Sequence, residues 1–416
     1  MNTKRPHLRP MDWLLDSQFA PYINAFTQYL AERRYSAQTI NTNLGCIAHF
    51  AHWMSQCRLD VHWISEDMVR QFLDEHLPQC DCVGPVYRTR YKLSAALGHL
   101  LVVFRANAII APRSAETTPV DEELRRFDEH MDQVRGLAPG TRRLYRRTVR
   151  RLLLGQFGTQ PVVISAITPD DIRRFVASQS DLYSTPSSAG TLVSALRGYL
   201  RFRAARGDQV HSLIGVLSYP ADWQMASLPK ALTRAEVEHL VDSLGHDGPS
   251  ARRGDAMVRC ALDLGLRAAE IAKLALDDID WRAGTIMLRK TKSRRVDILP
   301  LPQATGRAIA EYLKRERPPS SSRAVFVRRI APCDLPIGPD CVRKAIRQAY
   351  ARAGLPYTRA HLLRHTMAGR LLDSGSSLKE VADVLRHRSL DTTQIYAKLD
   401  SRNLAAVALP WPGWTA

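Results

Sequence analysis

The sequence predicts a mainly helical protein with one small β-hairpin, divided into several domains. Apolar residues recur with helical spacing along most of the chain, and two short strand-like segments flank residue 292. The length of 416 residues exceeds what one hydrophobic core usually organises. The chain is 45% apolar and 24% charged, which is typical of globular proteins and excludes a largely disordered or fibrous chain.

Two proline-containing segments, residues 111–119 and 219–229, predict linkers that divide the chain into domains at 1–112, 120–222 and 228–416. The first two domains carry the same three helical blocks in the same order, with a period of roughly a hundred residues, which indicates a duplicated helical bundle. The paired blocks are Phe26–Thr39 with Phe127–Thr141, Ile64–Leu73 with Ile167–Val176, and Ala96–Ala106 with Ala195–Ala204.

Short polar side chains mark the expected helix starts, because a hydroxyl oxygen can accept a hydrogen bond from an otherwise unpaired backbone N–H. Thr233 and Ser377 are each followed three residues later by glutamate, which is the capping-box pattern. The expected N-caps are Thr39, Ser65, Thr141, Thr168, Thr233 and Ser377.

The predicted hairpin has strands at 284–290 and 296–301, separated by the polar segment Thr291-Lys-Ser-Arg-Arg295. Its tip is therefore basic. Lys290 and Lys292 are both candidates for a functional lysine, and we favour Lys292 because a side chain at the tip can reach a DNA minor groove.

The charge of the chain predicts a polyanionic partner. Lysine and arginine number 59 against 41 acidic residues, which gives a net charge of +18 and favours nucleic acid. Six arginines recur at helical spacing between Leu144, Val149, Leu152 and Leu153, and we expect them to contact a phosphate backbone, although a solvated helix face has the same pattern. These arginines are Arg142, Arg143, Arg146, Arg147, Arg150 and Arg151.

Several protein classes are excluded. No stretch of about eighteen apolar residues predicts a transmembrane helix, and the basic N-terminus lacks the apolar segment of a secretory signal, so we expect a cytoplasmic, nucleoid-associated protein. Seven cysteines, an odd number, suit a reducing compartment. Cys80-Asp-Cys82 with His76 supplies half of a metal site, but the usual second ligand pair is missing. We interpret this segment as an ordinary loop and predict no metal and no cofactor.

Three clusters carry chemistry. Arg267 and Glu270 are three residues apart on one helix face, His361 and Arg364 share the same spacing, and His387 precedes Tyr396 by nine positions. Such a set suits phosphoryl transfer, because two arginines can stabilise a phosphorane, a tyrosine can attack phosphorus, and lysine or histidine can protonate the departing oxygen. No accompanying carboxylate cluster would hold Mg²⁺, so cationic side chains are expected to take its place.

These residues resemble the two signature boxes of the tyrosine recombinases, the phage-integrase type of site-specific recombinase. The first box is LGLRAAEIAKL with Arg267, the second runs from His361 through HLLRH to Tyr396, and the similarity covers roughly residues 120–400. The resemblance implies a catalytic domain preceded by a SAM-like, core-binding type bundle, here preceded by a second such bundle. It also implies DNA cleavage and rejoining through a 3′-phosphotyrosyl intermediate.

The resemblance implies a role for each residue. Arg267 and Arg364 would clamp the scissile phosphate, with Glu270 supporting Arg267. The remaining roles are leaving-group protonation by Lys292, acid–base transfer by His361, a phosphate hydrogen bond from His387, and nucleophilic attack by Tyr396. Double-stranded DNA would be the substrate, bound by a homo- or hetero-tetramer that includes paralogous subunits.

Two departures from the family stand out. Arg386 occupies the position before His387 where the family commonly has glycine, and the extra bundle at residues 1–112 is similar to what recombinases of mobile elements carry. Integration, excision or transposition of such an element is the expected activity. The alternatives are a type IB topoisomerase, a DNA-binding regulator with a non-productive site, and a helical scaffold, which would leave the charge and the clustered Arg, His and Tyr unexplained.

Overall fold

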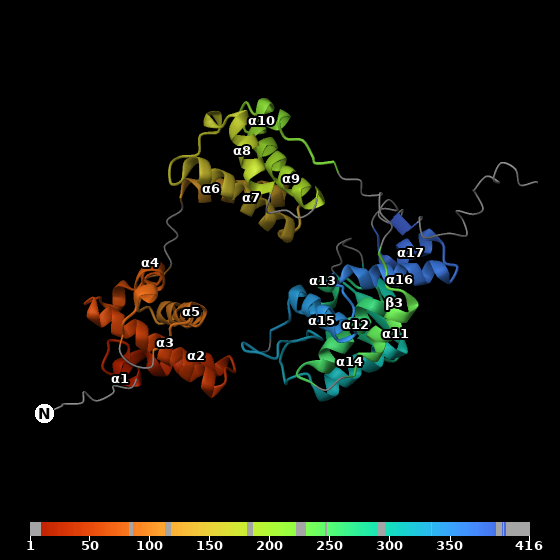
Figure 1. Cartoon of the computed structure of the whole chain (residues 1–416), viewed down its shortest axis with the longest axis horizontal. Coiled ribbons are helices and arrows are strands. Elements are labelled where there is room, and N and C mark those ends of the chain that lie inside the picture. The colour runs from red at the N-terminus through yellow and green to blue at the C-terminus, as the bar shows by residue number, and fades with distance from the viewer. Residues whose placement is uncertain are drawn as a thin grey trace, which may run out of the picture. The chain divides into compact units, whose positions relative to one another are not determined.

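The computed structural model describes residues 10–82, 86–112, 118–180, 186–221, 230–245, 248–289, 296–333, 335–387, 393, 395 and 396 (Figure 1). The chain divides into two compact units, one formed by residues 113–226 and the other by 1–112 together with 227–416. The prediction of a mainly helical protein with a small sheet is confirmed. None of the helices within these ranges combines the length and apolar character needed to cross a bilayer.

Residues 10–112 form a helical bundle around an aromatic core. Its helices are α1 (Pro10–Leu15), α2 (Ile23–Glu32), α3 (Ala37–Gln56), α4 (Glu66–Gln71) and α5 (Arg90–Ala106). A π-helical turn, Phe72–His76, continues α4 and is followed by a 3₁₀ turn at Leu77–Gln79. Phe26, Phe50 and Phe104 are fully buried among these helices, so apolar burial holds the bundle together.

The second bundle, residues 118–221, repeats this order of elements. Its helices are α6 (Pro119–Glu129), α7 (Pro139–Phe157), α8 (Pro169–Ser180), α9 (Pro186–Ala204) and α10 (His211–Gly215). A 3₁₀ turn at Val61–Trp63 separates α3 from α4, and one at Ile164–Ala166 separates α7 from α8. Two helices, a 3₁₀ turn and two further helices thus follow one another in both α2–α5 and α6–α9, while the π-helical turns fall at different places, and the duplication stays a prediction.

Four of the six expected N-caps are confirmed and two are wrong. The caps at Ser65, Thr168, Thr233 and Ser377 accept the expected backbone N–H three residues ahead. Thr39 is instead the third residue of α3, where its N–H donates to Ser36 Oγ over 3.2 Å. Thr141 is the third residue of α7, which starts with Pro139. The residue before Pro139 is Ala138, which has no side-chain oxygen to cap the helix.

The catalytic-type domain from residue 230 onward surrounds a central helix, α12. Its helices are α11 (Arg234–Asp242), α12 (Ala251–Asp263), α13 (Ala268–Ile271), α14 (Gln303–Arg315), α15 (Pro339–Arg352), α16 (His361–Asp373) and α17 (Leu378–Leu385). Helix α12 packs against α13, α14, α15 and α16 (Figure 1). Met257 and Cys260 of α12 are completely buried, so this helix forms the centre on which the site is assembled.

The predicted hairpin is confirmed as β2 (Thr285–Leu288) and β3 (Asp297–Pro300), with a short third strand, β1 (Ile279–Asp280), that the sequence analysis missed. The strand order is β1-β2-β3, all antiparallel, and Ile286 pairs with both Ile279 and Leu299. The tip at residues 290–295, which includes Lys290 and Lys292, lies outside the described residues.

A small second core at the C-terminal end joins α16, α17 and Tyr396. Ala368 and Leu372 of α16 pack with Val381 and Leu385 of α17, and the Tyr396 ring completes the cluster. The side chain of Tyr396 is only 1% exposed. Packing thereby places this tyrosine beside the polar residues of α16.

Candidate active site

Arg364 lies at the centre of the candidate site. It is 3% exposed, its Nη1 donates to the carbonyl of Gly265 over 2.5 Å, and its Nη2 donates to the carbonyl of Leu385. One guanidinium thus joins the turn after α12, helix α16 and the end of α17. Burial, with Arg267 and Arg386 nearby, lowers the pKa of Arg364 to about 9, so it stays largely protonated at neutral pH.

The turn at Gly265 requires glycine. Its φ is +59°, and a Cβ there would lie 3.0 Å from Leu385 Cδ2 and 3.3 Å from Met367 Sδ. A side chain would therefore be strained in its backbone and would also push α16 and α17 away. The glycine allows the carbonyl to reach Arg364.

Arg267, Glu270 and Arg386 form a buried ionic cluster beside Arg364. Arg267 Nη1 donates to Glu270 Oε1 over 2.8 Å, and Arg386 Nη2 donates to Glu270 Oε2 over 2.8 Å. The backbone N–H of Arg267 also donates to Oε2, so the carboxylate fixes both the start of α13 and the first-box arginine. Burial alone would raise the pKa of Glu270, but the charges and hydrogen bonds of Arg386 and Arg267 lower this pKa by more than burial raises it. The carboxylate therefore stays ionised.

The contacts of Arg386 explain how this position accommodates an arginine where the family commonly has glycine. It ends α17 with φ +55° and ψ +50°, the left-handed conformation that glycine adopts most easily. Its guanidinium does not crowd the turn but points inward to Glu270, with the side chain 1% exposed. The ion pair compensates for the cost of a non-glycine residue in this conformation.

Tyr396 is hydrogen-bonded to a histidine that the sequence analysis did not select. The Tyr396 hydroxyl lies 2.6 Å from Nδ1 of His365, on the same helix as Arg364. Burial raises the pKa of Tyr396 to about 12, while Arg364 and Arg267 act to lower it. Burial also lowers the pKa of His365 to about 4, with His361 and Arg364 adding to the effect. A neutral imidazole at neutral pH can accept the hydroxyl proton.

A signal for His365 was present in the sequence. His365 follows His361 by four residues within HLLRH, one turn further along the same helix, and one position after Arg364. The three-residue spacing of His361 and Arg364 predicts only these two residues as functional and passes over His365. Only the folded chain shows that the later histidine contacts the tyrosine.

His387 also lies close to Tyr396. The two rings are nearly parallel, with an angle of 7° and centroids 6.4 Å apart, and His387 Nδ1 lies 2.7 Å from Thr393 Oγ1. Burial lowers the pKa of His387 to about 4, with Arg364 next in effect. The imidazole is therefore neutral at neutral pH and retains Nε2 for a ligand.

The remaining sequence candidates are less central. His361 is the first residue of α16, is exposed, and has its ring centroid 6.3 Å from that of His365, so it stands at the edge of the site. Lys292 and its alternative Lys290 lie outside the described residues. The structure thus brings together Arg267, Glu270, Arg364, His387 and Tyr396, adds His365 and Arg386, and places His361 beside them.

The arginine row of α7 is divided between two environments. Arg142 contacts Asp128 and Asp132, each at 2.6 Å, and Arg150 contacts Asp121 at 2.5 Å. Arg143 and Arg147 are exposed, and no ion pair is recorded for either within the described part of the bundle. Leu144 was expected on the apolar face of this helix with Val149, Leu152 and Leu153. That prediction is wrong, because Leu144 is 41% exposed.

The site defines a class of protein. Guanidinium groups, neutral imidazoles and a tyrosine hydroxyl converge, while the carboxylate of Glu270 is engaged by arginines. Such a site can bind a phosphodiester and attack it covalently.

Comparison with known proteins identifies the family. Residues 230–402 match the phage integrase family and residues 124–207 match the phage integrase N-terminal SAM-like domain. The integrase/recombinase y4rA of Sinorhizobium fredii is 34% identical over 95% of both chains. The tyrosine recombinase XerC of Azotobacter vinelandii is 32% identical over 58% of this chain and 80% of its own. The chain therefore belongs to the phage integrase family of tyrosine recombinases, and its activity is site-specific DNA recombination by strand cleavage and rejoining.

Solved structures share the fold. The XerH site-specific recombinase, bound to a palindromic difH substrate, aligns with a TM-score of 0.53 and 15% identity over 98% of both chains. The Tn1549 transposon integrase, in complex with transposon right-end DNA, aligns with a TM-score of 0.51 and 17% identity over 69% of this chain and 99% of its own. The family assignment favours recombination over the topoisomerase alternative.

Replacing His365 tests its contact with Tyr396. His365→Leu removes the hydrogen bond at 2.6 Å, and we expect cleavage of a nicked suicide substrate to slow by about 5- to 150-fold, as for the loss of about 1–3 kcal/mol. The matched control is His239→Leu, an exposed histidine of α11, which should leave the rate unchanged. Equal rates in the two variants would remove His365 from the site.

Replacing Glu270 tests the ionic cluster. Glu270→Gln leaves the buried Arg386 without its counter-charge, and we expect a loss of about 3–5 kcal/mol in the free energy of unfolding, measured in urea. The same substitution in an Arg386→Gly background should cost less, because the stranded charge is gone and glycine suits the left-handed turn. Strictly additive losses would show that the two side chains are not coupled.

Proposed function

We propose that this recombinase cleaves DNA with Tyr396 as its nucleophile. The observation that carries the proposal is the hydrogen bond between the Tyr396 hydroxyl and His365, next to the guanidinium of Arg364. The hydroxyl oxygen attacks the scissile phosphorus, a 3′-phosphotyrosyl bond forms, and the 5′ oxygen of the broken strand leaves. Since the phosphotyrosyl bond conserves the free energy of the phosphodiester, rejoining needs no nucleotide cofactor.

Each neighbouring side chain has a part in this proposal. Arg267 and Arg364 bind the non-bridging phosphate oxygens and stabilise the charge of the phosphorane, and His387 donates a further hydrogen bond. Glu270 and Arg386 hold Arg267 in place. His365 accepts the tyrosine proton, because it is the imidazole in contact with the hydroxyl, and His361 assists proton transfer from the edge of the site.

Double-stranded DNA is the proposed substrate. The net charge of +18 supports it, and so do the exposed Arg143 and Arg147 on α7. Arg146 and Arg151 are also exposed on this helix. Arg142 has the weakest case as a phosphate contact, because two aspartates already hold it. The fold relatives XerH and the Tn1549 integrase were each solved with DNA, which agrees with this assignment.

We further propose a mobile element as the biological context. The relative y4rA aligns over 95% of this chain, so the similarity extends into residues 1–112 as well as the family domains. A duplicated bundle can extend the DNA contact or the contact between subunits. We expect such a recombinase to assemble on DNA as a tetramer, either with copies of this chain or with paralogous subunits. Its proposed location is cytoplasmic and nucleoid-associated.

The nucleophile can be tested directly. Tyr396→Phe removes one hydroxyl and leaves the phosphate-binding arginines in place, so we expect no covalent protein–DNA adduct while duplex affinity stays within a few fold. A suicide substrate nicked near the cleavage position, resolved on a denaturing gel, measures the adduct. An adduct in the variant would transfer the role to another tyrosine, with Tyr350, Tyr357 and Tyr312 as the candidates within the same domain.

The leaving-group lysine needs a chemical test. Lys292→Ala should slow cleavage by about 10²–10⁴-fold, and a bridging 5′-phosphorothiolate, whose sulfur leaves without protonation, should restore most of the rate. Lys290→Ala is the matched control and should lose little activity. Rescue of Lys290→Ala instead would assign the general acid to Lys290.

A further inference from the structure

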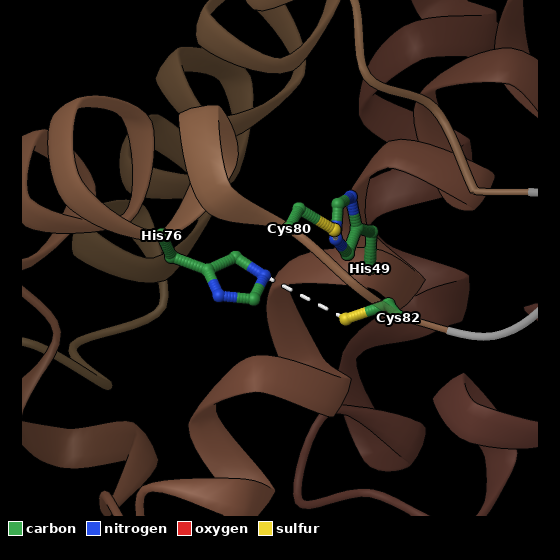
Figure 2. Close-up of side chains that lie close together, drawn as sticks. All are labelled: His49, His76, Cys80 and Cys82. Atoms are coloured by element: carbon green, nitrogen blue, oxygen red, sulfur yellow. Dashed lines mark hydrogen bonds between the residues drawn. The ribbon is translucent and has the colours of Figure 1, made fainter.

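Four potential metal ligands converge in the first bundle, far along the sequence from the recombinase residues. Figure 2 shows the side chains of His49, His76, Cys80 and Cys82 directed toward one another. Their ligand atoms all lie within 4.8 Å of one another. From the sequence, His76, Cys80 and Cys82 form half of a metal site in a segment predicted as an ordinary loop. The fourth ligand, His49, lies 27 positions before His76 on another helix.

The spacing of these atoms fits tetrahedral coordination. Cys80 Sγ lies 3.3 Å from Nε2 of His49, and Cys82 Sγ lies 3.6 Å from Nε2 of His76. Zinc bonds of about 2.3 Å to sulfur and 2.0–2.1 Å to nitrogen, at tetrahedral angles, place sulfur and nitrogen ligands about 3.5 Å apart. The two recorded sulfur–nitrogen distances lie on either side of that value.

The surroundings hold the histidines in a ligating orientation. Nδ1 of His49 lies 3.0 Å from the carbonyl of Tyr87, which as an acceptor fixes the proton on Nδ1 and leaves the Nε2 lone pair facing Cys80. His49 is fully buried and Cys82 is 5% exposed. The ring of Phe72 stacks on His76 at a centroid distance of 5.3 Å. A metal-bound histidine usually donates its other ring N–H to such a backbone carbonyl, a carboxylate or a water.

The backbone that carries three of the four ligands is irregular. His76 ends the π-helical turn Phe72–His76, and a 3₁₀ turn then delivers Cys80. π-helical turns cost stability and occur frequently at functional sites. Here the irregular stretch brings His76, Cys80 and Cys82 to one side, opposite His49 on α3.

We propose a structural zinc site in the first bundle, with His49, His76, Cys80 and Cys82 as its ligands. Two thiolates and two imidazoles in a closed tetrahedral set favour Zn²⁺ over oxygen-preferring ions such as Mg²⁺ or Ca²⁺. Binding releases the two thiol protons, so one Zn²⁺ replaces two H⁺. The ion ties α3 to the segment between α4 and α5. No coordination position remains for a substrate, so the role is structural and independent of DNA cleavage.

The first test measures metal in the full-length chain purified without chelator. We expect elemental mass spectrometry to find about one zinc per chain. The variants Cys80→Ser and Cys82→Ser should lose most of this zinc. The control Cys57→Ser changes an exposed cysteine of the same bundle and should keep the zinc. Stripping the metal should lower the melting temperature of the wild type and the control by more than about 5 °C, and leave the two ligand variants unaffected.

A second measurement avoids variants that fail to fold. Wild-type chain stripped of metal and loaded with Co²⁺ should show the intense visible bands of tetrahedral cobalt together with a thiolate-to-cobalt charge-transfer band. Three results would overturn the proposal: a folded wild-type chain without zinc, full zinc content in both cysteine variants, or a weak octahedral cobalt spectrum.

Discussion

The active site depends on one buried guanidinium. Arg364 donates to two backbone carbonyls, one in the turn at Gly265 and one at Leu385, so a single side chain joins three segments that are far apart in sequence. A buried arginine is costly unless its N–H groups are satisfied, and these carbonyls supply acceptors without neutralising its charge. The positive charge therefore remains available to a phosphate. Tyr396, in the adjoining apolar cluster, is positioned by the same helices.

Charge balance governs the rest of the cluster. Arg267, Arg364 and Arg386 lie near the carboxylate of Glu270, and Asp297 also acts electrostatically on Arg386. The deficit of negative charge is consistent with a site built for an anionic ligand, because a phosphodiester would supply what the protein lacks. Arg386 shows how far this balance extends. It takes a backbone conformation suited to glycine, and its guanidinium is directed to Glu270 instead of the solvent.

Chemistry at the site separates acid from base by environment. The buried imidazoles of His365 and His387 have lowered pKa values and stay neutral at neutral pH, whereas the tyrosine hydroxyl has a raised pKa and stays protonated at neutral pH. The hydroxyl and the imidazole of His365 are already in contact. A buried histidine is also held by a specific contact in the first bundle, where the backbone carbonyl of Tyr87 keeps the His49 ring in one orientation.

Local sequence patterns were enough to predict the fold class, the hairpin, four helix caps and the signature residues Arg267, Arg364, His387 and Tyr396. Each of these depends on local periodicity, on turn chemistry or on short motifs with fixed spacing. Tertiary structure alone decided the partners of these residues. His365 contacts Tyr396 across 31 positions, Arg386 reaches Glu270 across 116, and His49 joins Cys80 across 31. No local pattern encodes such contacts, because they arise when separate helices bury their apolar faces and bring polar side chains together.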